Sequence, residues 1–323
     1  MDNFWISLPR PILALAPMVG VTDSAFRQLA KQWGADVVYS EMISADALVH
    51  HAEKAHAMMD HVACEQPLVI QLMGNKPEVL AEAARMANAR GASGIDINFG
   101  CPARKIARNF CGVMLMRDFD LSRRLIEAVL TAVKLPVSIK VRVSIRKNPA
   151  SPACGYITIH DFLGKIADLP VAAVMVHGRS FEDSFDGGIR AEMIAEAKKI
   201  FTSGPVLANG GVTDVESARA LLQSTGADGL GLARSAIGRP WIFKQIRDFL
   251  MTGRYDDMQW QGIKETILQH AQLFDQYRGS IPFRDLRRHL THYVRSREQA
   301  SELRRRLVQV NASREVASIL SGY

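Results

Sequence analysis

Residues 68–98 have the sequence LVIQLMGNKPEVLAEAARMANARGASGIDIN and contain one complete unit of the expected fold. Two short apolar runs, Leu68–Leu72 and Gly94–Asn98, flank the segment Pro77–Arg90, whose apolar residues recur every three or four positions. Runs of this length are typical of buried strands, and that spacing is typical of an amphipathic helix. A strand, a helix and a second strand in this order indicate that the two strands pair in parallel.

The same alternation of strand and helix continues from the N-terminus to about residue 233. Eight such units in about 240 residues predict a closed (β/α)8 TIM barrel, and an open doubly wound sheet is the alternative. Helix N-caps are expected at Thr22 or Asp23, at Asn75, and at Thr213 or Asp214. The other expected strands are Ile12–Ala16, Asp36–Ser40, Val137–Arg142, Ala172–His177, Pro205–Asn209 and Asp228–Ala233, and the other expected helices cover 22–33, 121–133, 189–201 and 215–224.

The pattern changes after Trp241 and is helical from there to the end of the chain. Two breaks interrupt it, LMTG at 250–253 and GSIP at 279–282. We therefore expect an α/β protein with a catalytic barrel at 1–245, a linker near 250–260, and a small all-α domain at 255–323.

The overall composition is that of an ordinary folded protein. Of 323 residues, 48% are hydrophobic and 23% are charged, which excludes a disordered or fibrous chain. The four cysteines form no C-x-x-C pair, so neither a disulfide framework nor a zinc ribbon is indicated, no metal site is expected, and a cytoplasmic location is the default. The apolar run at 11–21 is too short to cross a membrane, so no membrane association is expected.

Most of the excess positive charge lies near the C-terminus. The net charge is +7, and residues 244–323 carry 14 Lys and Arg against 9 Asp and Glu. Between Arg278 and Arg306 there are nine arginines and no lysine. Because arginine binds phosphate in a bidentate manner and stacks on bases, this bias favours RNA or DNA as a partner, and a solvated helix face is the alternative.

Polar residues follow several of the expected strands. In a barrel of this kind the chemistry takes place at the carboxyl ends of the strands, and these ends form one mouth. The resulting set is cationic and rich in hydrogen-bonding groups, which suits an anionic, heteroaromatic ligand. Its members are Gln71, Asn98, Cys101, Lys140, Arg142, His177 and Arg179.

The last two expected strands are followed by sequences that suit a phosphate group. Gly210 and Gly211 would allow the backbone to approach a ligand closely, and Ala233 precedes Arg234 at the start of a short helix. Arg234 would add a bidentate contact. Each glycine-containing loop alone is also consistent with an ordinary tight turn.

Two strand-end residues suggest a specific chemistry. Lys140 ends an apolar strand, where its ammonium needs an anionic partner, and the N1–O2 edge of a reduced flavin would be one. His177 and Gln71 would hydrogen-bond to the same ring system, although His177 would also serve merely to end a strand. Cys101 lies between Gly100 and Pro102, and with an ordinary thiol pKa of about 8.5 it suits a general acid better than a nucleophile. A small buried apolar residue is the alternative role for this cysteine.

The run DINFGCPARK at 96–105, together with APM at 16–18, resembles the tRNA-dihydrouridine synthase family. The segment D-I-N-x-G-C-P is highly specific, the other matches support it, and the similarity extends over nearly the whole chain. The supporting matches are A-P-M-x-G-x-T-D-x-x-F-R at 16–27, H-G-R at 177–179, G-x-P-W at 238–241, and a segment at 284–289 that is similar to the family's R-x-x-R-K-H.

The resemblance implies a flavoprotein that binds FMN, takes hydride from NADPH and reduces the C5–C6 double bond of particular uridines in tRNA. It implies that Cys101 protonates C5, and that the partners are tRNA and NAD(P)H; we expect a monomer. The residues implied to hold FMN are Ala16, Pro17, Met18, Gln71, Lys140, His177, Asn209, Gly210, Gly211, Ala233 and Arg234. Those implied to contact RNA are Asn98, Arg142, Arg179, Arg284, Arg287 and Arg288.

The chain departs from the family pattern at several loops. Gly211 stands where N-G-D is common, Ala233 replaces a glycine, and Val143-Ser144 replace a small residue and a glycine. The sequence SFED at 180–183 is more acidic than is usual after H-G-R. These changes keep other functions open: a flavin-dependent RNA methyl-transfer enzyme, a small-molecule ene-reductase or dihydroorotate-type dehydrogenase, or a non-catalytic RNA-binding protein.

Overall fold

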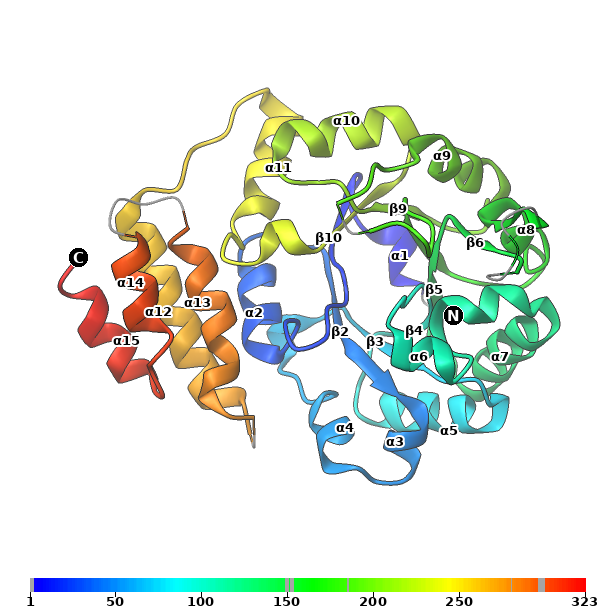
Figure 1. The fold of residues 1–323 in the computed structure, drawn as a ribbon, viewed down its shortest axis with the longest axis horizontal. Coiled ribbons are helices and arrows are strands. Elements are labelled where there is room, and N and C mark those ends of the chain that lie inside the picture. Colours follow the sequence, from blue (N-terminus) through cyan, green and yellow to red (C-terminus); the bar gives the residue numbers. More distant parts are fainter. Residues whose placement is uncertain (1–2, 149–150, 152–153, 185, 280, 296–299) are drawn as a thin grey trace.

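Eight parallel strands close into a barrel in the computed structural model of the chain (Figure 1). The structure describes residues 3–148, 151, 154–184, 186–279, 281–295 and 300–323. Neighbouring strands follow one another along the chain, and the first pairs with the last, so the closed barrel is confirmed and the open sheet is wrong. The barrel strands are β1 Ile12–Leu15, β2 Val37–Ser44, β3 Leu68–Met73, β4 Gly94–Phe99, β5 Val137–Arg142, β8 Ala173–His177, β9 Val206–Asn209 and β10 Gly229–Leu232.

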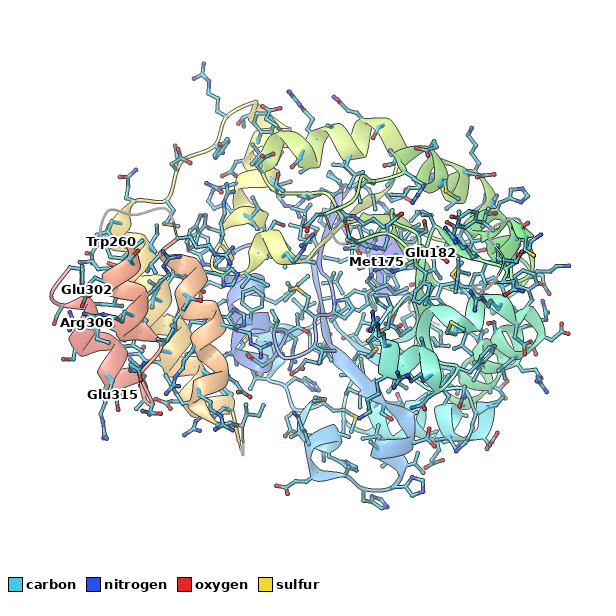
Figure 2. All side chains as sticks on the ribbon, in the orientation of Figure 1. Met175, Glu182, Trp260, Glu302, Arg306 and Glu315 are labelled. Atoms are coloured by element: carbon cyan, nitrogen blue, oxygen red, sulfur yellow. The ribbon has the colours of Figure 1, made fainter. Side chains whose placement is uncertain are left out.

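The barrel interior is a packed core. Buried apolar residues of the strands, among them Tyr39, Val69 and Leu207, form one cluster. Helix α1 (Phe4–Ser7) adds the fully buried Trp5, whose ring lies 6.3 Å from that of Tyr39. Met175 of β8, labelled in Figure 2, lies so close to β10 that a Cβ added at Gly231 would be 2.7 Å from its sulfur. The interior is therefore filled with side chains, and a ligand has room only at an end of the barrel.

The expected helices surround the barrel, with small differences at their starts. Asp23 and Asp214 cap their helices through side-chain hydrogen bonds, as expected. The expectation for Asn75 is wrong, because Lys76 occupies the cap position and Asn75 Nδ2 donates to the backbone oxygen of Asn109 at 2.9 Å. Proline at the first helical position keeps the residue before it extended, so the cap is Lys76, one residue after the expected position. The surrounding helices are α2 Ser24–Gln32, α5 Pro77–Ala89, α7 Phe119–Ala132, α8 Ile159–Gly164, α9 Ala191–Ile200, α10 Val215–Thr225 and α11 Ile242–Thr252.

Strand β2 is longer than expected. Its pairing with β3 shifts between Tyr39 and Met42, so Ser40 lies within the strand and not at its end. The strand continues to Ser44, which caps the short helix α3 (Ala45–Val49), and α4 (Glu53–Ala57) follows. At this shift in pairing the regular pattern of apolar residues is interrupted, so the sequence does not show that the strand continues.

Short elements extend the loops that follow β4 and β5. Helix α6 (Arg104–Arg108) and a 3₁₀ helix at Gly112–Arg117 come after β4. An antiparallel pair, β6 (Ser144–Arg146) and β7 (Tyr156–Thr158), comes after β5. These elements therefore lie on the side of the barrel where the carboxyl ends of the strands meet.

The C-terminal helices form a separate layer beside α2, at the left of Figure 1. They have an apolar core of their own, which includes Ile267, Phe274, Leu290 and Leu303. Among the described residues, no helix is long and apolar enough to cross a membrane. The helices are α12 Trp260–Tyr277, α13 Arg287–Tyr293, α14 Ala300–Leu307 and α15 Ser313–Leu320, with a 3₁₀ helix at Phe283–Leu286.

Candidate functional site

A chain of buried hydrogen bonds joins three neighbouring strands below the mouth of the barrel. Ser138 Oγ donates to Asp96 Oδ1 at 2.7 Å, and Gln71 Nε2 donates to Asp96 Oδ2 at 2.8 Å. Asn98 Nδ2 in turn donates to Gln71 Oε1 at 3.0 Å. The carboxylate of Asp96 accepts at both oxygens, so it fixes which way the Gln71 amide points, and Gln71 fixes Asn98.

The loop that carries Cys101 is held by the other end of this chain. Asn98 Oδ1 accepts from the backbone N–H groups of Gly100 at 3.1 Å and of Cys101 at 2.9 Å. Arg142 Nε donates to the oxygen of Gly100 at 3.0 Å. On the other side, Gly112 (φ +62°) packs so closely that an added Cβ would lie 2.8 Å from the Cys101 oxygen. The position of Cys101 is thus fixed by both neighbouring strands and by the following 3₁₀ helix.

The environment of Cys101 favours the protonated thiol. Burial raises the pKa of this thiol, and a hydrogen bond from the backbone of Ala103 and the charges of Lys140 and Arg142 offset that rise only in part. A protonated thiol near neutral pH donates a proton and is a poor nucleophile. Within the described part of the chain, no group of His, Cys, Asp and Glu is arranged to hold a metal ion.

Positive charge collects at the mouth of the barrel. Lys140 Nζ donates to Asn209 Oδ1 at 2.9 Å, and burial, followed by the charge of Arg142, lowers the pKa of Lys140 to about 8. Burial, followed by the positive charges of Lys140, Arg142, Arg179 and Arg234, lowers the pKa of His177 to about 2. His177 is therefore a neutral imidazole, and an anion bound among these cations would relieve their mutual repulsion.

The loop after β9 carries two glycines at positions that leave no room for a side chain. Gly210 (φ +99°) and Gly211 (φ +77°) both have left-handed backbones. A Cβ at Gly210 would lie 2.9 Å from the His177 ring, and one at Gly211 would lie 2.6 Å from Ile189. Arg234 begins a 3₁₀ helix after β10, and its Nη1 lies 3.7 Å from Asp186 Oδ1. Glycines and an arginine at these two adjacent loops fit a phosphate-bearing group.

The structure brings the expected residues of the barrel together at one end. Two of them also have structural contacts there, since Arg142 Nη1 donates to Ser180 O and Arg179 Nε donates to Gly187 O, each at 2.6 Å. Asn209 is held by its own amide, which donates to Gly231 O at 2.6 Å. The residues that end or directly follow barrel strands, or lie within one near its end, are Ala16, Pro17, Met18, Gln71, Asn98, Cys101, Lys140, Arg142, His177, Arg179, Asn209, Gly210, Gly211, Ala233 and Arg234.

Helix α13 contacts two of the mouth loops. A Cβ at Gly20, in the loop after β1, would lie 2.6 Å from Arg288 Nη1. A Cβ at Gly238, in the loop after β10, would lie 2.5 Å from the backbone carbon of His292. The C-terminal helices lie beside α2, and through α13 they reach the edge of the mouth at the loops after β1 and β10.

The three arginines of the C-terminal helices that are expected to contact RNA differ in what they bind within the protein. Arg287 Nε donates to Val310 O at 3.0 Å, and its Nη2 donates to Asn311 Oδ1 at 2.9 Å. Arg284 and Arg288 are exposed. Arg287 thus ties α13 to the segment between α14 and α15, whereas Arg284 and Arg288 present their charge to solvent. Of the same arginine-rich stretch, Arg297 lies outside the described residues.

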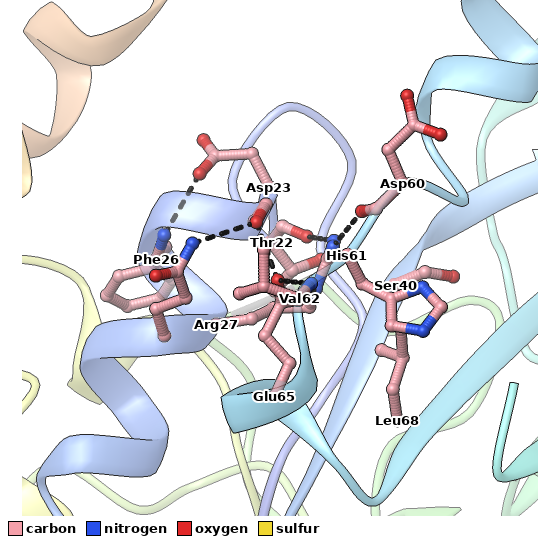
Figure 3. A network of polar contacts seen from close by, with 12 residues as sticks. Thr22, Asp23, Phe26, Arg27, Ser40, Asp60, His61, Val62, Glu65 and Leu68 are labelled. Carbon is pink, nitrogen blue, oxygen red and sulfur yellow. Dashed lines mark hydrogen bonds and ion pairs between the residues drawn. The ribbon is translucent and has the colours of Figure 1, made fainter. Parts of the chain in front are cut away.

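Sequence reasoning missed a buried ion pair beneath the loop after β1 (Figure 3). Arg27 of α2 pairs with Glu65, and its two terminal nitrogens donate to Thr22 O at 2.8 Å and to Asp60 O at 2.7 Å. Ser24 Oγ completes the group by donating to Glu65 Oε1 at 2.6 Å. Arg27 is the last residue of the motif at 16–27, but that motif does not indicate its partner Glu65.

A second missed feature is the aromatic contact between the barrel and the helical layer. The ring of Phe26 on α2 lies 4.7 Å from that of His289, which lies 4.7 Å from that of His270. His270 Nδ1 is 3.0 Å from the hydroxyl of Tyr293. Burial lowers the pKa of both histidines, so they act as neutral packing groups in this interface.

Comparisons with known proteins agree with one another. A family model described as dihydrouridine synthase matches residues 14–321. The chain is 37% identical to tRNA-dihydrouridine synthase B of Pseudomonas syringae pv. tomato, over 90% of this chain and 85% of that protein. It is 35% identical to tRNA-dihydrouridine synthase B of Yersinia pestis, over 96% and 95%.

Among solved structures, the chain is similar in fold to a histamine dehydrogenase from Rhizobium sp. 4-9. The TM-score is 0.55 at 13% identity, and the match covers 81% of this chain and 49% of that one. An amine oxidase from Pseudomonas geniculata N1 gives a TM-score of 0.54 at 15% identity, over 74% and 47%. At these identities the likeness concerns the barrel fold alone.

Proposed function

Because this chain belongs to the dihydrouridine synthase family, we propose that it is an oxidoreductase that reduces the C5–C6 double bond of uridines in tRNA. The observation that carries the proposal is the position of Cys101, a protonated thiol that Asn98 and Arg142 hold at a cationic barrel mouth. A mouth of this kind supports proton donation next to a bound, electron-rich ring.

A flavin is the cofactor that the mouth fits, and we propose FMN reduced by NADPH. Bound there, the flavin would supply hydride to C6 of the uracil. Lys140, held by Asn209, would face the electron-rich edge of the ring, and neutral His177 would hydrogen-bond beside it. Gln71, oriented by Asp96, would present its amide to the same ring. The phosphate would lie at Gly210, Gly211 and Arg234, with Ala16, Pro17, Met18 and Ala233 lining the remaining edge.

The residues of the chain would complete the addition. Cys101 would transfer its proton to C5, where negative charge develops as C6 receives hydride. Asn98 would contact the uracil while its oxygen keeps the Cys101 loop in place. Arg142 and Arg179 would lie over the substrate and contribute positive potential.

The helical layer would bind the rest of the tRNA. A uridine has to leave its stack to reach the mouth, at a cost of a few kcal/mol, and contacts to phosphates would offset that cost. Arg284 and Arg288 are available for this role. We keep residues 1–245 as the catalytic domain and 255–323 as the RNA-binding domain, with a single chain acting in the cytoplasm. Helix α11 crosses the first boundary and packs on the barrel through Ile246 and Phe249.

The direct test compares dihydrouridine in tRNA from cells with and without this protein, and in tRNA treated with purified protein and NADPH. We expect loss of dihydrouridine at defined positions in the deletion strain, recovery with the wild-type gene, and a purified protein that carries FMN. An unchanged dihydrouridine map, or a purified protein that neither carries nor binds FMN, would overturn the proposal. New methylated bases in place of dihydrouridine would indicate RNA methyl transfer instead.

A further inference from the structure

Three exposed cations lie on the short helix that follows Cys101. Arg104, Lys105 and Arg108 all lie on α6, which begins three residues after Cys101, and none of the residues of this helix is buried. Three steps of about 3.8 Å limit the Cα separation of Arg104 and Cys101 to about 11 Å. Helix α6 therefore begins close to the position where the uridine would react.

These cations have no partner within the described part of the chain. Neither a hydrogen bond nor an ion pair with a described residue involves any of the three side chains. Other exposed cations do have acidic partners, since Lys76 pairs with Asp46 and Arg190 pairs with Asp183. Three adjacent cations without an acidic neighbour repel each other, and an anionic ligand would remove that repulsion.

An exposed aromatic residue follows the same helix. Phe110 has a left-handed backbone (φ +52°), and 36% of its surface is exposed. A left-handed conformation is unfavourable for a bulky side chain. It is imposed here from both sides, because Asn109 O accepts from Asn75 Nδ2 at 2.9 Å and Cys111 N donates to Ile106 O at 3.2 Å. A strained, partly exposed aromatic ring at the rim of a site indicates a binding role.

The helix and Cys101 are positioned by one common contact. A Cβ at Gly112 would lie 2.8 Å from Cys101 O and 3.2 Å from Ile106 Cγ2, so both pack against this glycine. Helix α6 lies near β4 in Figure 1, on the other side of the mouth from α13. The two basic surfaces, on α6 and on α13, thus flank the mouth from opposite sides.

We propose that α6 and Phe110 form a second RNA-binding surface, the α6 surface, which binds the strand on either side of the reacting uridine. Arg104, Lys105 and Arg108 would contact the adjacent phosphates, and an unpaired neighbouring base would stack on Phe110. This inference rests on the proposed function for the identity of the RNA. The combination of unpaired cations and an aromatic face matches an unstacked nucleic-acid strand, which offers phosphates and bases together.

The test is a charge reversal with a matched control. The test variant is Arg104→Glu with Arg108→Glu, and the control is Arg124→Glu with Lys199→Glu, which makes the same change in charge on exposed positions of α7 and α9. We would measure tRNA binding across salt concentrations and kcat/KM for dihydrouridine formation. The test variant should lose about tenfold or more in kcat/KM, and its log–log salt slope should fall by about 0.7 for each phosphate that the variant no longer binds.

A second pair of variants examines stacking separately. Phe110→Leu retains an apolar side chain without a ring, and Phe110→Tyr retains the ring. We expect the leucine variant to weaken tRNA binding about fivefold or more and the tyrosine variant to stay near wild type, because every base stacks on an aromatic face. Equal behaviour of the two variants would overturn the stacking role.

The outcomes separate the inference from the function on which it rests. If the wild-type protein forms dihydrouridine and the test variant has the kcat/KM and the salt slope of the control, the α6 surface is not an RNA-binding surface. If the test variant has a reduced salt slope but the wild-type protein forms no dihydrouridine in any tRNA, the surface stands and the proposed function fails. Unchanged tRNA binding together with capture of an acidic peptide by the wild type alone would assign the surface to a protein partner and overturn the inference.

Discussion

The mouth of the barrel and the C-terminal helices both contain arginines. The sequence predicts the location of the side chain well at the mouth and poorly in the helices. Arg142 ends β5 and Arg179 follows β8, and both lie at the mouth where the strand pattern places them. Arg287 and Arg288 are neighbours in one arginine-rich segment, yet Arg287 binds inside the helical layer and Arg288 lies against the mouth loop at Gly20. Strand position therefore predicts where a side chain goes, whereas charge on a helix predicts only that a charged surface exists.

The physical reason lies in the geometry of the two elements. Parallel strands in a closed barrel all end at the same rim, so every residue that ends a strand is directed to one place. Consecutive residues of a helix point about 100° apart, because a turn takes 3.6 residues. Adjacent arginines on α13 thus have different surroundings, and only the packing of α14 and α15 decides which of them is used internally.

The largest effect is expected at the mouth. Cys101→Ala should lower the rate of uridine reduction by about 10² to 10⁴, the usual contribution of a general acid, and leave reduction of the flavin by NADPH intact. Its melting temperature should remain close to that of the wild type. Stopped-flow reduction and a dihydrouridine assay give the two rates. An unimpaired variant would show that another group donates the proton.

The pH dependence of the same step sharpens this expectation. Burial raises the pKa of Cys101 above the ordinary thiol value of about 8.5. Because the protonated thiol is the active form, the rate of uridine reduction should hold through neutral pH and fall only as the pH rises through that raised value. Single-turnover rates between pH 6 and 10 would show this. A decline centred near pH 7 would assign the proton to a different residue.

The next effect is on stability, at the buried ion pair of Arg27 and Glu65 beneath the loop after β1. Glu65→Ala leaves the buried Arg27 without its partner, which typically costs about 3–5 kcal/mol in the free energy of unfolding. Glu82→Ala is the control, since its pair with Arg85 is exposed and worth less than about 1 kcal/mol. Denaturant unfolding measures both. Equal stability of the two variants would mean that the pair beneath the loop after β1 contributes little.

A smaller effect is expected inside the helical layer. Arg287→Ala removes hydrogen bonds to Val310, Gln309 and Asn311, so the free energy of unfolding should fall by about 1–3 kcal/mol. The salt dependence of tRNA binding should not change. A flattened salt slope with unchanged stability would reassign this arginine to the RNA-binding surface and weaken the contrast drawn above.

The smallest effect belongs to Arg288. Arg288→Ala should leave stability within about 0.5 kcal/mol of the wild type, as is usual for exposed positions. The log–log salt slope of tRNA binding should fall by about 0.7–0.9, corresponding to one phosphate contact. Fluorescence anisotropy with labelled tRNA at several salt concentrations measures the slope. An unchanged slope would place the RNA away from α13.

The fold was largely predictable from the sequence because its signals are local. All eight barrel strands lie within a few residues of the expected ranges, since each is a short apolar run next to an amphipathic helix. The exception is β2, where the shift in pairing after Tyr39 extends the strand beyond Ser40. The rule that chemistry lies at the strand ends then placed the residues of the mouth, because all strands of the closed barrel end at one rim.

The remaining features depend on contacts between distant residues. Arg27 and Glu65 are 38 residues apart in the chain, and nothing in the local pattern around either residue predicts their pairing. Asp96 lies inside a strand, and its control of Gln71 depends on the register of β3 against β4. The role of Arg287 depends likewise on a segment that follows it by more than twenty residues. Periodicity and composition carry no information on such pairs.

The contact of α13 with the barrel has a consequence for engineering. Gly238 has φ +70°, and any side chain there would collide with the backbone at His292, while Gly20 leaves room for the guanidinium of Arg288. Transplanting the C-terminal helices onto another eight-stranded scaffold would therefore fail unless the recipient also offered glycine at the equivalent of position 238. A chimaera that transfers the C-terminal helices should therefore also transfer the loops that contain Gly20 and Gly238.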